Sequence, residues 1–190
     1  GDNFQRFYIH YLSVTKSATN PYVYDVRGKT RVKDNICDFT GIITIITAKL
    51  EDNPDYTPKY KPGNVTCRVL FYEDSTQSGT GTIKGTLTSR FFFDKKGSLA
   101  YDALMFSADG FSNNRCEATW TSYKTGRGKK CNWGDYRIPD SGELDGGAGE
   151  FIPSAKYLPS GWESYRKSYL GSQDAESLEA RAIEKRAWWK

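Results

Sequence analysis

The fold of this chain is decided by residues 80–138, which read TGTIKGTLTSRFFFDKKGSLAYDALMFSADGFSNNRCEATWTSYKTGRGKKCNWGDYRI. The segment holds four runs rich in β-branched and aromatic residues, which favour strands, over 80–93, 99–108, 115–123 and 130–138. The separators between them are rich in Gly, Asn, Asp and Lys, and the first three of these adopt the backbone conformations that tight turns need. Evenly spaced runs joined by turns predict an up-and-down antiparallel sheet.

The first of these runs alternates most clearly. Ile83, Leu87 and Phe91 fall on one face of the expected strand, and threonines and a lysine fall on the other. This period of two predicts one packed face and one solvent-facing face. Gly81 and Gly85 predict curvature or a close approach of two backbones, as bent barrel strands require.

The N-terminal half adds further strand-like runs, at 4–14, 22–26, 30–32, 35–50 and 65–72. The tripeptide Arg27-Gly28-Lys29 lies between two of them and predicts a hairpin. The total is about eight strands, which is near the number that closes a small barrel, and closure removes exposed sheet edges. We therefore expect a mainly β protein built as an antiparallel up-and-down barrel, with a β-sandwich as the alternative.

Helical signals follow the strand-like region. Ser160 and Glu163 have the spacing of a capping box, which predicts the start of a helix, and Gly171 predicts its end. A last helix is expected over 174–188, with a thin apolar stripe of Ala175, Leu178, Ala182 and Trp189. The expected organisation is a barrel with long loops over 1–158 and a helical extension packed on it over 159–190.

The charge and hydropathy pattern exclude several classes of protein. The 27 basic and 23 acidic residues give a net charge of +4, and the basic residues are scattered. Nucleic-acid binders carry a basic stripe instead, so no nucleic-acid partner is expected. No run of about 18 apolar residues occurs, so no membrane-spanning helix is expected. The chain starts at Gly1 rather than at Met, and we expect that an export signal upstream was removed.

Four cysteines occur, at Cys37, Cys67, Cys116 and Cys131. None has the C-x-x-C spacing, which argues against zinc and thioredoxin-like chemistry. An even count in a β protein favours export and up to two disulfides, for which three pairings exist. Four buried free thiols are the alternative.

Few residues offer chemistry. His10 is the one histidine, so a multi-histidine metal site is excluded, and its position within a strand predicts a hydrogen-bonded structural residue. Five carboxylates crowd residues 135–150, where they could serve hydrolysis, hold calcium or simply face solvent. The glycine run 146–149 lacks the lysine of a phosphate-binding loop, so no nucleotide site is expected.

A block of sequence carries a resemblance. It comprises residues 117–123 (EATWTSY), 131–139 (CNWGDYRIP), Leu144-Asp145 and 147–151 (GAGEF), and it resembles uncharacterised exported bacterial proteins. The strand pattern is similar to lipocalin-like (calycin) barrels. This resemblance implies an exported protein (periplasmic, secreted or a cell-surface lipoprotein) and no known activity. The glycine-x-tryptophan signature of a first lipocalin strand is absent from residues 4–14, so ligand binding is not carried over from that family.

Three functions from different classes follow. The first is a non-enzymatic exported barrel that binds a small apolar or amphipathic ligand without a cofactor. Its expected lining is Phe91, Phe93, Tyr101, Met105, Trp120 and Trp133. The second is a surface module that binds a protein or glycan through loops and the C-terminal helices, with Trp162 and Tyr165 involved. The third is a hydrolase that uses acidic residues of 135–150.

Overall fold

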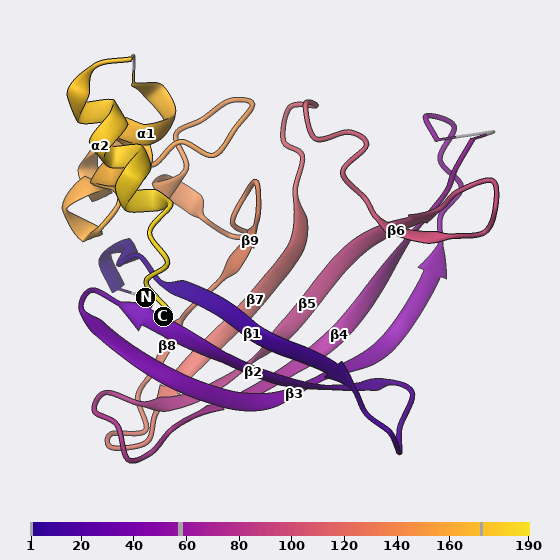
Figure 1. Ribbon diagram of the computed structural model, residues 1–190, viewed down its shortest axis with the longest axis horizontal. Coiled ribbons are helices and arrows are strands. Elements are labelled where there is room, and N and C mark those ends of the chain that lie inside the picture. The colour runs from indigo at the N-terminus through magenta and orange to yellow at the C-terminus, as the bar shows by residue number, and fades with distance from the viewer. Residues whose placement is uncertain (1, 57–58, 172) are drawn as a thin grey trace.

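The computed structural model describes residues 2–56, 59–171 and 173–190. Gly1, on which the expectation of a removed export signal rests, lies outside this part. The described chain forms an antiparallel sheet of nine strands that curls into a half-barrel, followed by two short helices (Figure 1). The expected mainly β fold is therefore confirmed.

The strands follow one another along the chain. They are β1 (Tyr8–Lys16), β2 (Val23–Val32), β3 (Asn35–Leu50), β4 (Lys61–Glu73), β5 (Gly81–Phe93), β6 (Leu99–Tyr101), β7 (Asn113–Ser122), β8 (Gly128–Lys130) and β9 (Trp133–Asp135). Their order in the sheet is β1-β2-β3-β4-β5-β7-β8, with β6 paired to β5 and β9 paired to β7. The long strands β1 to β5 thus form a meander in which each strand lies beside its neighbour in sequence.

The predicted hairpin at residues 27–29 is wrong. Arg27 and Lys29 lie inside the continuous strand β2, opposite Thr40 and Asp38 of β3. The chain reverses instead after Val32, where Lys33 takes a positive φ of 55°. Gly28 does not serve a turn. It leaves room for a neighbouring ring, because a Cβ atom there would lie 2.5 Å from Phe39.

The strands predicted late in the chain are shorter than expected. The run 99–108 contributes only β6, because Asp102 turns the chain inward: its side chain is buried and accepts hydrogen bonds from the Tyr56 hydroxyl (2.7 Å) and the Leu104 N–H (3.1 Å). The run 130–138 contributes the three-residue strand β9 and, at Lys130, the end of β8. Among the described strands, β1 on one side and β8 and β9 on the other do not pair with each other, so the sheet remains a half-barrel.

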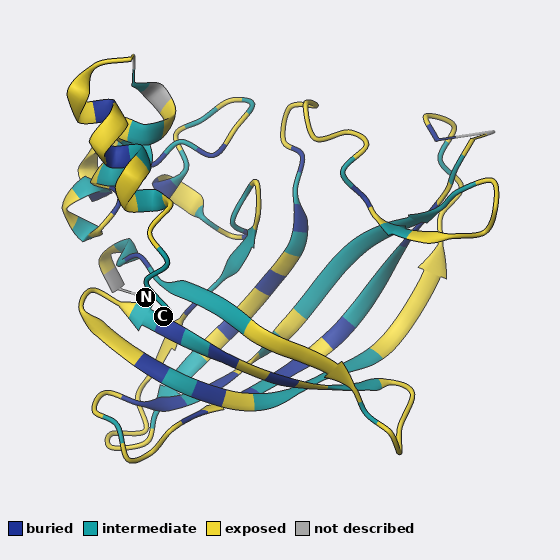
Figure 2. Cartoon of the chain, viewed as in Figure 1, coloured by how far each residue is buried: buried dark blue, intermediate teal, exposed yellow. Residues whose placement is uncertain are grey.

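The main core lies on the concave face of this curled sheet. Its buried members include Val26, Phe39, Val69, Phe71 and Ile83. Figure 2 shows buried and exposed residues alternating along the strands, as one packed face and one solvent face require.

Glycines let large rings of the next strand lie flat against the backbone. A Cβ atom at Gly41 would lie 2.9 Å from the Phe71 ring, and one at Gly81 would lie 2.7 Å from the Trp120 ring. The close approach predicted for Gly81 is confirmed, and the same holds at Gly85, where the contact is Ala118. At these positions the strands come closer together than a Cβ atom would allow.

The chain after β9 forms a second, smaller cluster. It contains the short 3₁₀ turns η2 (Gly142–Leu144) and η3 (Ala155–Ser160) and the helices α1 (Glu163–Leu170) and α2 (Ala175–Glu184). It packs beside the N-terminal turn η1 (Asp2–Phe4) at one end of the half-barrel (Figure 1). None of the described helices is long and apolar enough to cross a membrane.

The helices begin differently from the expectation. Ser160 does not cap α1: it ends η3, and its hydroxyl donates to the Asn3 carbonyl (2.9 Å). Of the predicted stripe, Ala175, Leu178 and Ala182 are exposed on α2, and Leu178 is 52% exposed. Trp189 lies beyond the end of α2 and is half-buried. The buried face of α2 is Ser177 and Ala180. The stripe prediction was wrong because α2 packs on α1 through small residues, which a search for large apolar side chains does not find.

Candidate functional site

An open groove runs along the concave face, between the free edge strand β1 and the strands β7 and β9. Its volume is about 980 Å³. The apolar part of its lining comes from both sides and from the floor of the half-barrel, and includes Phe7, Ile9, Leu87, Tyr101 and Trp133. The groove exists because the edges of the sheet do not close on each other.

The sequence places these side chains by simple alternation. Phe7, Ile9 and Tyr11 are two residues apart, so they point to the same face of β1 and its lead-in segment. Leu87 lies opposite Cys116 of β7, and Cys116 lies opposite Trp133 of β9. The groove is therefore lined by one row of side chains that crosses three strands, facing the row from β1.

Tyr11 contributes a polar group with unused bonding capacity. Its hydroxyl is buried and has no hydrogen-bond partner among the described residues. Burial raises the pKa of Tyr11 well above its ordinary value, and a polar contact of the hydroxyl with the Trp133 side chain, too poor in geometry to count as a hydrogen bond, opposes this rise only in part. The hydroxyl therefore stays protonated and can both donate and accept.

A polar cluster lies at the rim of the same groove. Asp135 accepts hydrogen bonds from the Tyr101 hydroxyl (2.8 Å) and the Asn114 amide (2.7 Å). Burial, and then the neighbouring carboxylate of Asp135, raise the pKa of Tyr101 above its ordinary value. The rim thus offers carboxylate, amide and phenol groups beside the Trp133 ring.

The predicted ligand-binding residues do not all lie together. Tyr101 and Trp133 line the groove, and Trp120 lines a separate cavity at the other side of Phe7. Phe91 and Phe93 contact each other on β5 with ring centroids 5.7 Å apart, next to β6. Met105 is 40% exposed in the loop after β6.

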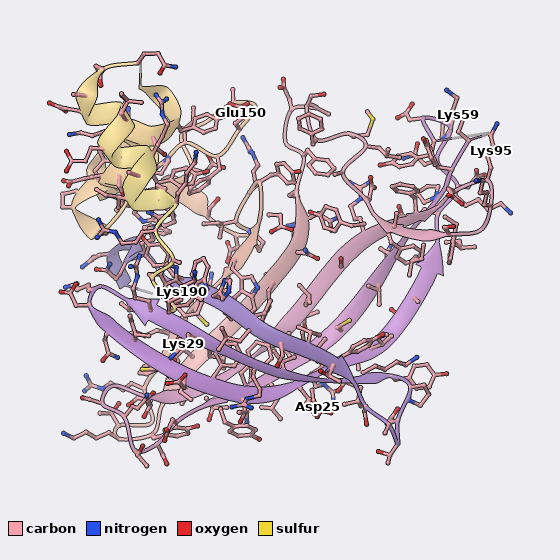
Figure 3. All side chains as sticks on the ribbon, in the orientation of Figure 1. Asp25, Lys29, Lys59, Lys95, Glu150 and Lys190 are labelled. Atoms are coloured by element: carbon pink, nitrogen blue, oxygen red, sulfur yellow. The ribbon has the colours of Figure 1, made fainter. Side chains whose placement is uncertain are left out.

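The position of Phe91 and Phe93 relative to the groove follows from their place at the end of β5. Lys95, which follows Phe93 closely in sequence, lies at one end of the molecule, and Lys190 lies at the other end with the helices (Figure 3). Phe91 has a structural task there, since its ring covers Gly63, where a Cβ atom would lie 2.6 Å away. The phenylalanine pair therefore belongs to the end of the sheet opposite the helices.

The aromatic residues of the C-terminal region are anchors. Trp162 is 5% exposed, and its indole N–H donates to the Phe4 carbonyl (2.8 Å). Tyr165 packs on Phe151 with centroids 5.6 Å apart. Both Trp162 and Tyr165 also line the helical end of the groove.

The acidic loop spreads its carboxylates over different partners. Asp140 pairs with Lys130, and Glu143 pairs with Lys156 and accepts from Tyr157. Asp145 accepts from two backbone N–H groups, those of Gly147 and Ile152. Within residues 2–56, 59–171 and 173–190, no group of three or more His, Cys, Asp or Glu is arranged to hold a metal ion.

His10 is held by stacking. Its ring lies 3.7 Å from the Trp189 ring, at an angle of 13°. Trp188 packs beside it on Tyr8. The chain's C-terminal residues therefore cover the outer side of the edge strand β1.

Sequence reasoning missed two polar residues of the concave face, Tyr11 and Glu73. Glu73 is the last residue of β4, and it continues the inward alternation of Cys67, Val69 and Phe71. This alternation was the sequence signal that could have placed Glu73 on the concave face. It was missed because a charged residue at the end of an apolar run was assigned to the following loop.

These features define a class: a curled antiparallel half-barrel with an open, aromatic-lined groove on its concave face. Comparison with family models, with curated protein sequences and with solved structures gives no match.

Proposed function

We propose that this protein is a non-enzymatic binder of a small amphipathic ligand, which it holds in the groove between β1 and β9. The observation that carries the proposal is an open volume of about 980 Å³ that has among its lining residues Tyr11, whose buried hydroxyl makes no hydrogen bond of ordinary geometry to the described residues. Natural small-molecule sites are apolar concavities with a few placed polar groups, and this groove has that composition.

The lining fits a ligand with two chemically different parts. Ile9, Leu87 and Trp133 offer an apolar surface for a chain or ring system. Tyr11 offers a hydrogen bond that costs free energy when it is left unmade in a buried place. A ligand that carries a hydroxyl or carbonyl group near its apolar body would satisfy both.

A glycan is the second candidate, and the groove rim favours it. Trp133 and Tyr101 present rings next to Asp135 and Asn114. Flat apolar rings beside planar polar groups suit a sugar, which has an apolar face and a polar edge. A glycan array with the wild-type protein distinguishes the two candidates.

Export belongs to the same proposal. Its support is the sequence block within residues 117–151 that resembles uncharacterised exported bacterial proteins. The test is N-terminal sequencing of the protein from its native cell, together with its location in the periplasm, at the surface or in the medium.

The binding test uses N-phenyl-1-naphthylamine, an uncharged probe whose fluorescence rises in apolar surroundings. Leu87→Trp narrows the groove and should lower the probe's affinity at least several-fold. The matched control is Thr86→Trp, on the outward face of the same strand, which should leave the affinity unchanged. Equal affinities for the wild type and Leu87→Trp would refute binding in this groove.

A further inference from the structure

A second cavity lies at the end of the half-barrel where the turns β2–β3, β4–β5 and β7–β8 meet. Its volume is about 380 Å³, within the roughly 300–1,000 Å³ that is usual for small-molecule sites. Its lining includes Phe7, Thr30, Cys37, Glu73, Trp120 and Cys131. It is distinct from the groove and shares only Phe7 with it.

Glu73 is the one acidic residue of the described lining, and it is 5% exposed. Its Oε1 accepts from the Thr30 hydroxyl, and its Oε2 accepts from the Gly81 N–H (2.9 Å) and the Trp120 indole N–H (2.7 Å). All three donors are neutral. Among the residues that the structure describes, no lysine or arginine forms an ion pair with this carboxylate.

The three hydrogen bonds do not need a negative charge. A glutamine at position 73 could accept from Gly81 and Trp120 through its carbonyl oxygen and donate to the Thr30 oxygen through its amide. A buried charge costs free energy unless it is compensated by an opposite charge. The carboxylate therefore carries a charge that these contacts leave without a counter-charge.

We propose that this second cavity binds a small organic cation, such as an alkylammonium ion, with its positive group on Glu73. A carboxylate offers about four acceptor positions, and the described donors use three. The Trp120 ring lines the same cavity and attracts a cation through its face. Phe7 and Val32 supply apolar surface for the rest of the ligand.

The lysines at the cavity do not replace this cation. Lys130 is exposed, and its ammonium group pairs with Asp140. Lys129 is exposed on β8. The charges of Lys129 and Lys130 lie in water, which screens them strongly. The charge of the buried Glu73 is screened much less.

The charge of Glu73 affects the pKa values of the two cysteines that line the cavity. Burial, and then the charge of Glu73, raise the pKa of the Cys37 thiol above its ordinary value. Burial raises the pKa of Cys131 to about 12, and Glu73 adds to this rise. Both thiols stay neutral, so neither they nor any described side chain of the lining supplies a competing buried charge.

The test compares three probes of equal length: hexylammonium, hexanoate and 1-hexanol. Calorimetric titration of the full chain should give saturable binding of hexylammonium and none of hexanoate. Glu73→Gln should weaken hexylammonium binding at least tenfold. Glu117→Gln, on the exposed outward face of β7, is the matched control and should change nothing.

The Glu73→Gln variant is checked for folding by N-phenyl-1-naphthylamine, which should still bind in the groove. A second measurement needs no variant: the Gly81 amide resonance should shift on addition of hexylammonium and not of hexanoate, because that N–H donates to Glu73. Equal hexylammonium affinity in Glu73→Gln, or an unmoved Gly81 resonance, would overturn the proposal. Because the two sites use different probes, loss of one function leaves the other measurable.

Discussion

The buried hydroxyl of Tyr11 should have a measurable effect on the stability of the protein. Because its buried hydroxyl has no described partner, Tyr11→Phe removes an unsatisfied polar group. We expect the free energy of unfolding in urea to rise by about 1 kcal/mol. The control is Tyr101→Phe, which breaks the bond to Asp135 and should lower that free energy by up to about 1 kcal/mol. A loss of stability in Tyr11→Phe would mean that the hydroxyl is satisfied in solution.

Single residues of this fold were predictable to different degrees. Trp133 and Tyr101 were assigned to a binding surface from their type and position, and both line the groove. Phe91 is aromatic as well, yet its ring packs on Gly63 of the neighbouring strand. Residue type alone does not distinguish these cases, because the register between strands decides which ring faces an opening and which covers a glycine.

Within the strands, glycines such as Gly41 allow a close approach of the neighbouring strand. Gly41→Ala would place a Cβ atom 2.2 Å from the Leu70 carbonyl oxygen, so β3 and β4 must move apart. We expect a loss of about 1–3 kcal/mol in urea unfolding. Gly146→Ala is the control, since its nearest neighbour would lie 3.7 Å away, and it should change stability little. Equal effects of the two substitutions would contradict a special role of Gly41.

The helix α2 is tied to the N-terminal segment by an ion pair. Arg6 donates to both oxygens of Glu184, at 2.8 and 2.6 Å, and Ser164 donates as well. Burial acts to raise the pKa of Glu184, but the hydrogen bonds from Arg6 and Ser164 outweigh it and hold that pKa below its ordinary 4.5. The stabilisation is therefore fully present above about pH 4.5 and is lost as the pH falls through the lowered pKa.

We expect the link between α2 and the N-terminal segment to weaken in acid. Helical circular dichroism should show a loss below pH 4.5 that is reduced in Glu184→Gln. That variant should also be less stable by roughly 1.5–3 kcal/mol at neutral pH, the value of a hydrogen bond to a charged group. Glu179→Gln, on an exposed position of the same helix, should keep the wild-type acid profile. An unchanged profile in Glu184→Gln would contradict the role of the pair.

Elements with a long, strict alternation were predicted well, and elements set by single contacts were not. β5 was expected over 80–93 and spans Gly81–Phe93, because Ile83, Leu87 and Phe91 fall on one face while polar residues fall on the other, which identifies a strand. The strand expected at 99–108 ends at Tyr101, because the buried Asp102 receives a hydrogen bond from Tyr56, far away in sequence. A contact of that kind leaves no local pattern.

The curl of the whole molecule was predictable, and its incomplete closure was not. Evenly spaced strands and glycines indicate a bent sheet, but closure depends on how the first and last strands meet. Here the last strands, β8 and β9, have three residues each. They are too short to pair along β1, and the C-terminal tryptophans cover its outer side instead. The groove is therefore a property of the whole chain.

All four cysteines are buried in the folded protein. Cys37, Cys67, Cys116 and Cys131 are buried free thiols, so the expected disulfides are not formed. Burial raises the pKa of each of the four, most strongly in Cys116 and Cys131, which keeps the reactive thiolate scarce at neutral pH. Iodoacetamide should therefore modify the folded protein slowly.

In denaturant without a reductant, mass spectrometry should find all four thiols alkylated by iodoacetamide. Prior reduction should leave that number unchanged, because no sulfur–sulfur bond is present to break. Ser122→Cys, at a half-buried position at the end of β7, should add a fifth site that reacts faster in the folded state than the four natural ones. A reductant-dependent increase in alkylation would show that two of these thiols form a disulfide, and would contradict four free thiols.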